Sequence, residues 1–300
     1  MEIVVTLVSE PKVLTIDNNV INGAKNCLKA NGAKYTSKKT LAAGEAVDLC
    51  FTDIAAPQAQ ALLEDCFSDQ KIDICCQINR GRKKKMLVCD MDSTILSVEC
   101  IDEIADAMGI KDKISAITEA AMQGQLDFSA SLIERVALLK GLPEEKLEEV
   151  YKNRIHLSPG AETLVATMLK KGALTLLISG GFTYFSEKVA LKLGFQHHHA
   201  NILEIENGVL TGRVTMPTVD AMSKRNLLIK FRNENHIDPS LVVAVGDGAN
   251  DIPMINAAEL GVAYKAKPKT IEQANAAINH TGLETVLFFQ GYKRAEFVLT

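Results

Sequence analysis

Two acid clusters, each at the end of an apolar run, are the residues of this 300-residue chain best suited to chemistry. The first run ends in Asp90 and Asp92, and the second ends in Asp247 and Asp251. Apolar runs of this length are typical of buried strands, and ligands bind at the carboxyl ends of parallel strands. The two clusters therefore predict several carboxylates around one hard cation, and Mg²⁺ prefers such oxygen ligands.

This pattern suits phosphoryl transfer. A carboxylate beside a metal can attack a phosphoryl group and form an acyl phosphate, a role that falls to Asp90. Asp92 could protonate the leaving alkoxide and later deprotonate the attacking water. We expect Asp90, Asp92 and Asp247 to bind the metal, with Asp251 as a further ligand or as a residue that orients the others.

The transferred phosphoryl group also needs cationic and dipolar partners. Ser179 ends a strand-like run, and Gly180 and Gly181 allow backbone N–H groups to approach closely. Lys224 could supply a point charge. Taken singly, these residues form an ordinary turn and an ordinary surface lysine. Their order between the two acid clusters favours the functional interpretation.

The elements that position these residues alternate in type along most of the chain. Strand and helix patterns alternate after residue 155, as in a doubly wound, mostly parallel Rossmann-like sheet. Residues 97–154 carry only helical spacing and form an all-helical cap. We expect a phosphohydrolase core of residues 81–96 and 155–300. The predicted helices of the cap are Glu99–Met108, Lys113–Gln123, Ser129–Leu139 and Glu144–Arg154.

Residues 1–80 have a different pattern, close to a β-α-β-β-α-β order. This order predicts a small N-terminal α+β domain of ferredoxin-like topology, whose role in ligand binding or in a homodimer the sequence leaves open. The polar segment Asn79–Lys85 contains five basic residues. We interpret it as a solvated linker, since no aromatic interleaving supports a nucleic-acid patch.

The net charge of −4 argues against nucleic-acid or membrane binding. No signal peptide or membrane span is recognisable, so a cytoplasmic location is expected. Seven cysteines without a Cys-x-x-Cys pair predict reduced, structural thiols. His197, His198 and His199 invite a metal interpretation, but neighbouring side chains on a strand point to opposite faces and cannot easily converge.

The motifs are similar to those of the haloacid dehalogenase-like phosphohydrolases. Within that superfamily, about residues 84–290 resemble the bacterial phosphoserine phosphatases. The resemblance implies Mg²⁺-dependent hydrolysis of a small molecule, O-phospho-L-serine, to L-serine and phosphate through an aspartyl-phosphate, the last step of serine biosynthesis. The four matching motifs are Asp90–Thr94, Ile178–Phe182, Lys224 and Gly246–Asp251.

The same resemblance assigns roles to residues of the cap. Glu99 stands where a glutamate meets the substrate ammonium group, and Arg135 where an arginine binds the substrate carboxylate. Met122 and Phe128 match apolar residues that close over the substrate, so the cap is expected to act as a lid. The matches to phosphate and substrate contacts are Ser179, Gly180, Lys224 and Asn250.

Alternatives remain at this level. The same machinery could hydrolyse another small phosphate ester or transfer the phosphoryl group to an alcohol, although a substrate without an amino-acid head would leave Glu99 and Arg135 unpaired. A second class of function is a non-enzymatic amino-acid sensor with a degenerate core. The intact set of acidic residues with Lys224 argues against this class. Dehalogenation is disfavoured because that branch of the superfamily uses no metal.

Overall fold

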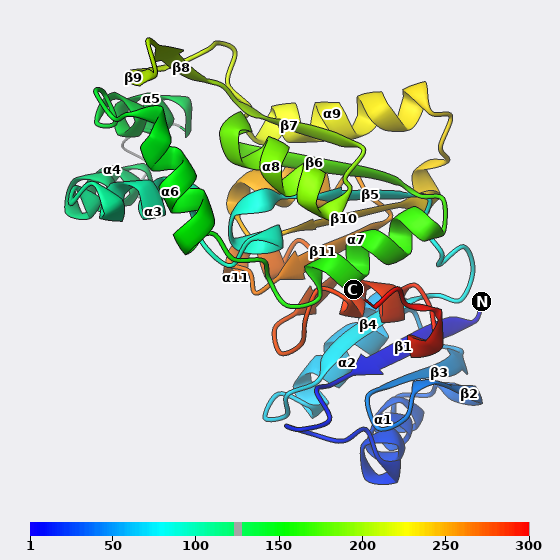
Figure 1. Cartoon of the computed structure of the whole chain (residues 1–300). Coiled ribbons are helices and arrows are strands. Elements are labelled where there is room, and N and C mark those ends of the chain that lie inside the picture. Colours follow the sequence, from blue (N-terminus) through cyan, green and yellow to red (C-terminus); the bar gives the residue numbers. More distant parts are fainter. Residues whose placement is uncertain (123–127, 300) are drawn as a thin grey trace.

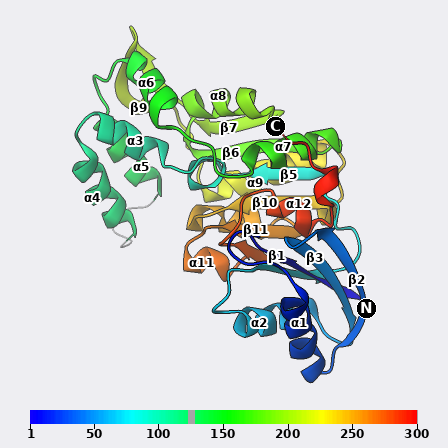
Figure 2. The same cartoon turned by 60° about the horizontal axis from the view of Figure 1, so that its bottom comes forward.

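The computed structural model describes the backbone of residues 1–122 and 128–299, and the side chains of these residues outside 119–128. It contains a six-stranded sheet with helices on both faces, a group of helices beside it, and a four-stranded sheet at the opposite end (Figures 1 and 2). No helix in the described ranges is both long and apolar enough to cross a membrane.

The six-stranded sheet is parallel throughout and has the order β12-β11-β10-β5-β6-β7. The first strand in sequence, β5, therefore lies near the middle, between β10 and β6. This arrangement confirms the predicted doubly wound fold and brings the two acid clusters onto adjacent strands. The strands are β5 (Met86–Cys89), β6 (Leu174–Phe182), β7 (His197–Asn201), β10 (Val242–Gly246), β11 (Leu260–Tyr264) and β12 (Ala276–Ile278).

Alternate residues of the central strands pack into two separate cores, as the period of two in a strand requires. Leu87 and Cys89 face one core, and Met86 and Val88 face the other. Helices α7, α8 and α12 contribute to the first core, and α9 and α10 to the second. The helices of this part are α7 (Ala161–Lys170), α8 (Thr183–Leu193), α9 (Ala221–Glu234), α10 (Ile252–Ile255), α11 (Pro268–Ile271) and α12 (Thr285–Phe289).

Four helices, which we call the helical insertion, lie between η1 (Met91–Ile95) and α7. The chain enters and leaves the insertion through two paired segments: Ser97 N donates to His156 O at 2.9 Å, and Ser158 N donates to Ile95 O at 2.9 Å. The four helices are α3 (Cys100–Ala107), α4 (Lys111–Met122), α5 (Phe128–Ala137) and α6 (Glu144–Arg154).

A hairpin from the core, β8 (Leu203–Glu206) and β9 (Val209–Val214), is bonded to the helical insertion. Gly141 N donates to Leu210 O, and Leu210 N donates to Leu142 O, both at 2.9 Å. The turn of this hairpin is Asn207-Gly208, and both residues have positive φ, 52° and 74°. Such a pair matches the right-handed twist of a two-residue hairpin.

The N-terminal segment folds in the predicted β-α-β-β-α-β order, with an antiparallel sheet of order β2-β3-β1-β4. The strand β2 has no apolar alternation because most of its residues are exposed, so the sequence does not mark it as a strand. Helices α1 and α2 pack on one face of this sheet. The elements are β1 (Ile3–Val8), α1 (Asn18–Ala30), β2 (Lys34–Ala42), β3 (Ala46–Thr52), α2 (Ala56–Cys66) and β4 (Asp73–Ile78).

The basic segment Asn79–Lys85 is only partly the solvated linker that we expected. The Arg82 side chain is 10% exposed and forms a bidentate ion pair with buried Asp48, at 2.7 and 3.1 Å. It also donates to Phe289 O at 3.0 and 3.2 Å. Lys84 is buried and donates to Ser240 O at 2.8 Å. These two cations are buried because they satisfy acceptors at the junction of the two sheets.

Removing Arg82 tests this junction. In Arg82→Ala, Asp48 would remain buried without a positive charge beside it and with only the Thr6 hydroxyl as a donor, so we expect the free energy of unfolding to fall by about 3–5 kcal/mol. Lys83→Ala is the matched control, because the Lys83 ion pair with Glu296 is largely exposed and should contribute at most about 1 kcal/mol. Urea unfolding of both variants measures the difference, and equal losses would contradict the assignment.

Candidate active site

Several of the residues that the sequence indicates for chemistry meet at the carboxyl edge of the six-stranded sheet. Asp90 follows β5, and Asp247 follows β10. Asp251 lies one short turn beyond Asp247, in η3 (Ala249–Asp251). Lys224 reaches the same place from the first turns of α9, whose N-terminus is capped by Asp220. The strand ends thus bring together side chains that are far apart in sequence.

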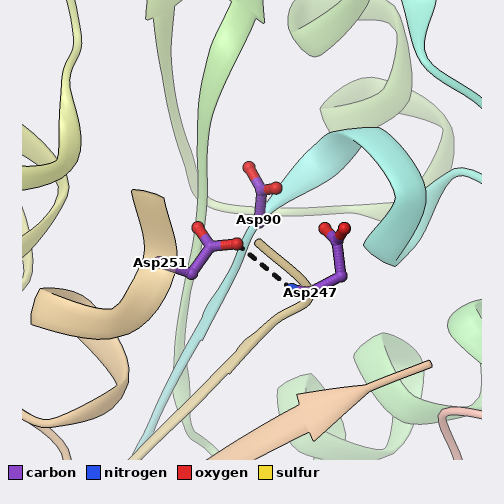
Figure 3. Close-up of side chains that lie close together, drawn as sticks. All are labelled: Asp90, Asp247 and Asp251. Carbon is purple, nitrogen blue, oxygen red and sulfur yellow. Dashed lines mark hydrogen bonds between the residues drawn. The ribbon is translucent and has the colours of Figure 1, made fainter. Parts of the chain in front are cut away.

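Three carboxyl groups form the centre of this site. Asp90, Asp247 and Asp251 each offer an oxygen atom, and these atoms lie within 4.8 Å of one another. Figure 3 shows the three side chains gathered around one space, with the bond between the Asp251 carboxyl and the Asp247 backbone N–H. Among the described residues, this is the group of acidic, histidine and cysteine side chains that could hold a metal ion.

Lys224 supplies the positive charge at this centre. Its Nζ donates to Asp90 Oδ1 at 2.6 Å and to Asp251 Oδ1 at 2.7 Å, and all three side chains are buried. The second oxygen of Asp251 accepts from the backbone N–H groups of Asp247 and Gly248, at 3.1 and 3.0 Å. Both oxygens of Asp251 are therefore engaged, and this residue fixes the positions of the others.

The Asp92 carboxyl group is not one of the three clustered carboxyl groups, and metal binding by Asp92 stays a prediction. Its Oδ1 accepts from Cys100 N at 2.9 Å, and its Oδ2 accepts from Ser179 Oγ at 3.2 Å. These bonds turn the side chain toward β6 and the start of α3. Asp251, which we expected as a further ligand or as a residue that orients the others, is the third member of the cluster.

Burial shapes the protonation of the carboxyl groups. Desolvation raises the pKa of Asp90, and the neighbouring charge of Asp251 adds to this effect. Desolvation also raises the pKa of Asp92, and that of Asp247 to about 6. Burial alone would lower the pKa of Lys224, but Asp251 and Asp90 outweigh burial and raise it. One ammonium group therefore faces an excess of carboxylates, which is an arrangement that favours a bound cation.

Gly181, the second glycine after Ser179, is required by close packing at this edge. A Cβ atom at Gly181 would collide with Asp92 Oδ2 and lie 3.0 Å from Ser179 Oγ. Instead, Gly181 N donates to Ser179 Oγ at 2.8 Å. Asn201, which the sequence did not single out, accepts from Val219 N at 2.7 Å and donates to Gly180 O at 2.8 Å. It thereby joins this turn to the segment that precedes Lys224.

Two further hydroxyl groups belong to the site. Thr94 Oγ1 donates to Asp247 Oδ1 at 3.2 Å and so links the turn after β5 to the turn after β10. Ser93 adopts a left-handed φ of 54°, which is uncommon for a residue with a side chain. Its Oγ donates to Glu99 Oε1 at 2.6 Å. The sequence feature that could have indicated Ser93 and Thr94 as site residues is their position directly after Asp92.

The two charged residues assigned to the substrate occupy the insertion. Glu99 immediately precedes α3, where desolvation by the surrounding protein, together with the charge of Asp92, raises the pKa of its carboxyl to about 7. Arg135 lies on α5, half-buried, with Asp102, Glu99 and Asp92 as the nearest opposite charges. Among the described residues, Arg135 forms no ion pair within 4 Å, and its Nε donates to Ser131 O at 3.3 Å.

The remaining predicted residues are placed less fully. Met122 ends α4 and Phe128 begins α5, and their side chains lie outside the described part of the structure. Asn250 is half-buried in η3, where the absence of a side chain on Gly248 leaves room for its amide oxygen. Next to Phe128, Ser129 Oγ lies 2.9 Å from Thr218 Oγ1, so α5 contacts the loop before α9.

The three consecutive histidines do not converge, as expected for a strand. His197 and His199 lie on one face of β7 and flank the Phe231 ring, with ring centroids at 4.6 and 5.4 Å. His198 lies on the opposite face, with Nδ1 3.0 Å from Ser186 Oγ.

Sequence comparison identifies the family that shares this fold and site. The profile of the haloacid dehalogenase-like hydrolases matches residues 87–256, which is more than half of the chain. The matched segment contains Asp90, Lys224 and Asp247. The chain therefore belongs to the haloacid dehalogenase-like hydrolases.

Within this family, the chain is similar to several phosphoserine phosphatases. The phosphoserine phosphatase of a Polaromonas species is 47% identical over 208 residues, which cover 68% of this chain and 88% of that protein. A HAD family hydrolase from Salmonella enterica serovar Typhi has a TM-score of 0.84 at 31% identity, covering 96% and 98% of the two chains. A phospho-aspartyl intermediate analogue of phosphoserine phosphatase has a TM-score of 0.65 at 40% identity, covering 69% and 99%. The chain is a phosphatase of this family.

The raised pKa of Asp247 predicts how stability depends on pH. The pKa of Asp247 is raised from its ordinary value of 3.8 to about 6 in the folded chain. The folded chain therefore holds this proton at higher pH than the unfolded chain does. In EDTA, this residue should therefore lower the free energy of unfolding as pH rises through 6. Asp247→Asn should be more stable than the unmodified chain at pH 8, and this advantage should shrink at pH 5. Urea unfolding at both pH values measures this, and an advantage independent of pH would contradict the prediction.

Proposed function

We propose that the protein hydrolyses O-phospho-L-serine to L-serine and phosphate through an aspartyl-phosphate on Asp90, with Mg²⁺ as cofactor. The observation that carries this proposal is the buried Asp90 held by Lys224 Nζ at 2.6 Å, inside a cluster of carboxyl groups. The phosphoserine phosphatases among the relatives support the choice of substrate. The reaction would be the last step of serine biosynthesis.

Asp90 is suited to act as the nucleophile because one of its oxygens is fixed and the other is available. Lys224 holds Oδ1, and among the described residues Oδ2 accepts no hydrogen bond. In the first step a bond forms between Asp90 Oδ2 and phosphorus, while the bond from phosphorus to the serine oxygen breaks. Lys224 also provides positive charge beside the transferred group.

Asp92 is suited to move the proton. Burial raises its pKa, which favours the protonated form that can donate to the leaving serine oxygen. The resulting carboxylate then accepts a proton from the water that attacks the acyl phosphate, and this step releases phosphate and restores Asp90. The bonds from Cys100 N and Ser179 Oγ keep Asp92 in one orientation during both steps.

The carboxyl cluster fits the proposed cofactor. Asp90 and Asp247 would hold the ion, with Asp251 at the same centre, and these oxygen donors match the preference of Mg²⁺. When bound, Mg²⁺ would neutralise charge on the phosphoryl oxygens. The excess of buried carboxylates over the single Lys224 charge supports a cation at this position.

Glu99 and Arg135 would select the amino-acid head of the substrate. The Glu99 carboxylate would complement the ammonium group, and the planar Arg135 guanidinium can bind a carboxylate in a bidentate manner. Arg135 is half-buried and has no ion-pair partner among the described residues, so a substrate carboxylate would satisfy it. A phosphate ester without both groups would leave these charges unpaired.

Phosphate release from L-phosphoserine tests the function directly. We expect activity with Mg²⁺, loss of activity in EDTA, and recovery when Mg²⁺ is restored. Asp90→Asn should lower kcat by at least about a thousandfold because the nucleophile is lost, while its thermal unfolding stays cooperative. Asp69→Asn, an exposed aspartate far from the site in sequence, is the control. Metal-independent turnover, or an active Asp90→Asn variant, would overturn the mechanism.

A second prediction separates substrate selection from chemistry. Arg135→Ala should lower kcat/KM for phosphoserine by about 10- to 150-fold, the value of a hydrogen bond to a charged group. Activity on p-nitrophenyl phosphate, which has no carboxylate, should change by less than about threefold. Arg213→Ala, which removes an exposed arginine of the hairpin, should affect neither substrate. Equal losses on both substrates would show that Arg135 does not read the carboxylate.

A further inference from the structure

The cysteines fall into two groups by exposure. All seven thiols are free, and five of them are buried. Cys66 is exposed and Cys27 is half-buried. These two residues belong to the N-terminal sheet and helices, and neither takes part in the site described above. The prediction of buried structural thiols therefore holds for five cysteines and does not explain this pair.

Cys27 and Cys66 are neighbours although 38 residues separate them in sequence. Cys27 lies on α1, and Cys66 is the last residue of α2. Cys66 is among the neighbours that raise the pKa of the Cys27 thiol. Cys27 Sγ also donates to Leu62 O at 3.5 Å, one turn before Cys66.

The helix packing fixes this contact independently of the thiols. Gly23, one turn before Cys27, leaves space for the Phe67 ring, whose nearest atom would lie 3.6 Å from a Cβ atom at Gly23. Phe67 is buried and directly follows Cys66. The contact between Gly23 and Phe67 and the contact between Cys27 and Leu62 therefore hold the end of α2 against α1, and Phe67 and Leu62 lie on either side of Cys66.

We propose that Cys27 and Cys66 form a redox-active dithiol, which low-molecular-weight disulfides such as oxidised glutathione convert to an intramolecular disulfide between α1 and α2. The exposed Cys66 thiolate would attack first and form a mixed disulfide, releasing one glutathione. Cys27 would then lose its proton to solvent and attack the Cys66 sulfur, releasing the second glutathione. Two protein thiols are oxidised and one small disulfide is reduced to two thiols.

The order of the two steps follows from the surroundings of each sulfur. Burial raises the pKa of the Cys27 thiol to about 11, and the neighbouring Cys66 adds to this effect. Cys27 is therefore a poor first nucleophile, since the thiolate is the reactive form. Once Cys66 carries glutathione, the position of Cys27 against the last turn of α2 makes the second step intramolecular.

The position of the pair also defines what the modification would change. Helices α1 and α2 cover the face of the N-terminal sheet that points away from the rest of the molecule (Figure 2). The Arg82 junction and the carboxyl cluster lie elsewhere. Oxidation would therefore join two surface helices and leave the catalytic edge of the large sheet unmodified.

Oxidation of the full chain under native conditions tests the proposal. The protein is incubated with oxidised glutathione at pH 8, acidified, and alkylated with N-ethylmaleimide in denaturant. Digestion with trypsin and an Asp-N protease separates Cys66 from Cys50, since Asp53 and Asp65 lie between them. We expect one linked peptide pair that contains Cys27 and Cys66, a loss of two alkylated thiols, and full reversal by dithiothreitol.

Two single variants supply the controls. In Cys27→Ser, glutathione should remain on Cys66 as a stable mixed disulfide because the resolving thiol is missing. In Cys66→Ser, little glutathione should be incorporated because the remaining thiols are buried or half-buried. Stable glutathione on Cys66 in the unmodified chain, a link between Cys66 and another cysteine, or a disulfide between two chains would overturn the proposal.

Discussion

One buried ammonium group, that of Lys224, holds the catalytic edge together. It bonds to Asp90 and Asp251, which follow different strands of the sheet. Without this charge, two carboxylates would be buried next to each other with no cation to offset their desolvation, which is strongly unfavourable. Asp220 caps α9 and so fixes the first turns of the helix that carries Lys224. The local helix cap and the long-range ion pairs therefore specify the same arrangement.

The two sheets are joined by polar groups that are paired, rather than by apolar contact alone. Arg82 neutralises Asp48 and satisfies the Phe289 carbonyl. Asp73, at the start of β4, accepts from the backbone N–H groups of Asn279 and Thr281, at 2.8 and 3.0 Å. Such bonds are directional, so they define one relative orientation where apolar surfaces would permit several.

The sequence predicted those parts of the site that depend on local pattern. Asp90 and Asp247 follow apolar runs, and strand order alone brings such ends together. The sequence could not predict the direction of the Asp92 side chain, because it depends on Cys100 and Ser179, which the fold brings to it. Arg82 was interpreted as solvated for the same reason: its partner Asp48 lies 34 residues away. The β-α-β-β-α-β order was predicted, but the bounds of β2 could not be, because its mostly exposed residues carry no period-two signal.

The helical insertion is connected to the sheet by two neighbouring chain segments, paired through Ser97 with His156 and Ser158 with Ile95. Asp90, the proposed nucleophile, and Lys224 belong to the sheet and its helices, whereas Arg135 belongs to the insertion. Exchange of the insertion would thus cut the chain only at these two neighbouring segments and leave the bonds of Lys224 to Asp90 and Asp251 intact. In evolutionary terms, the proposed nucleophile and the proposed substrate-selecting arginine are carried by separate pieces of the chain, which remain coupled through the bond from Cys100 N to Asp92.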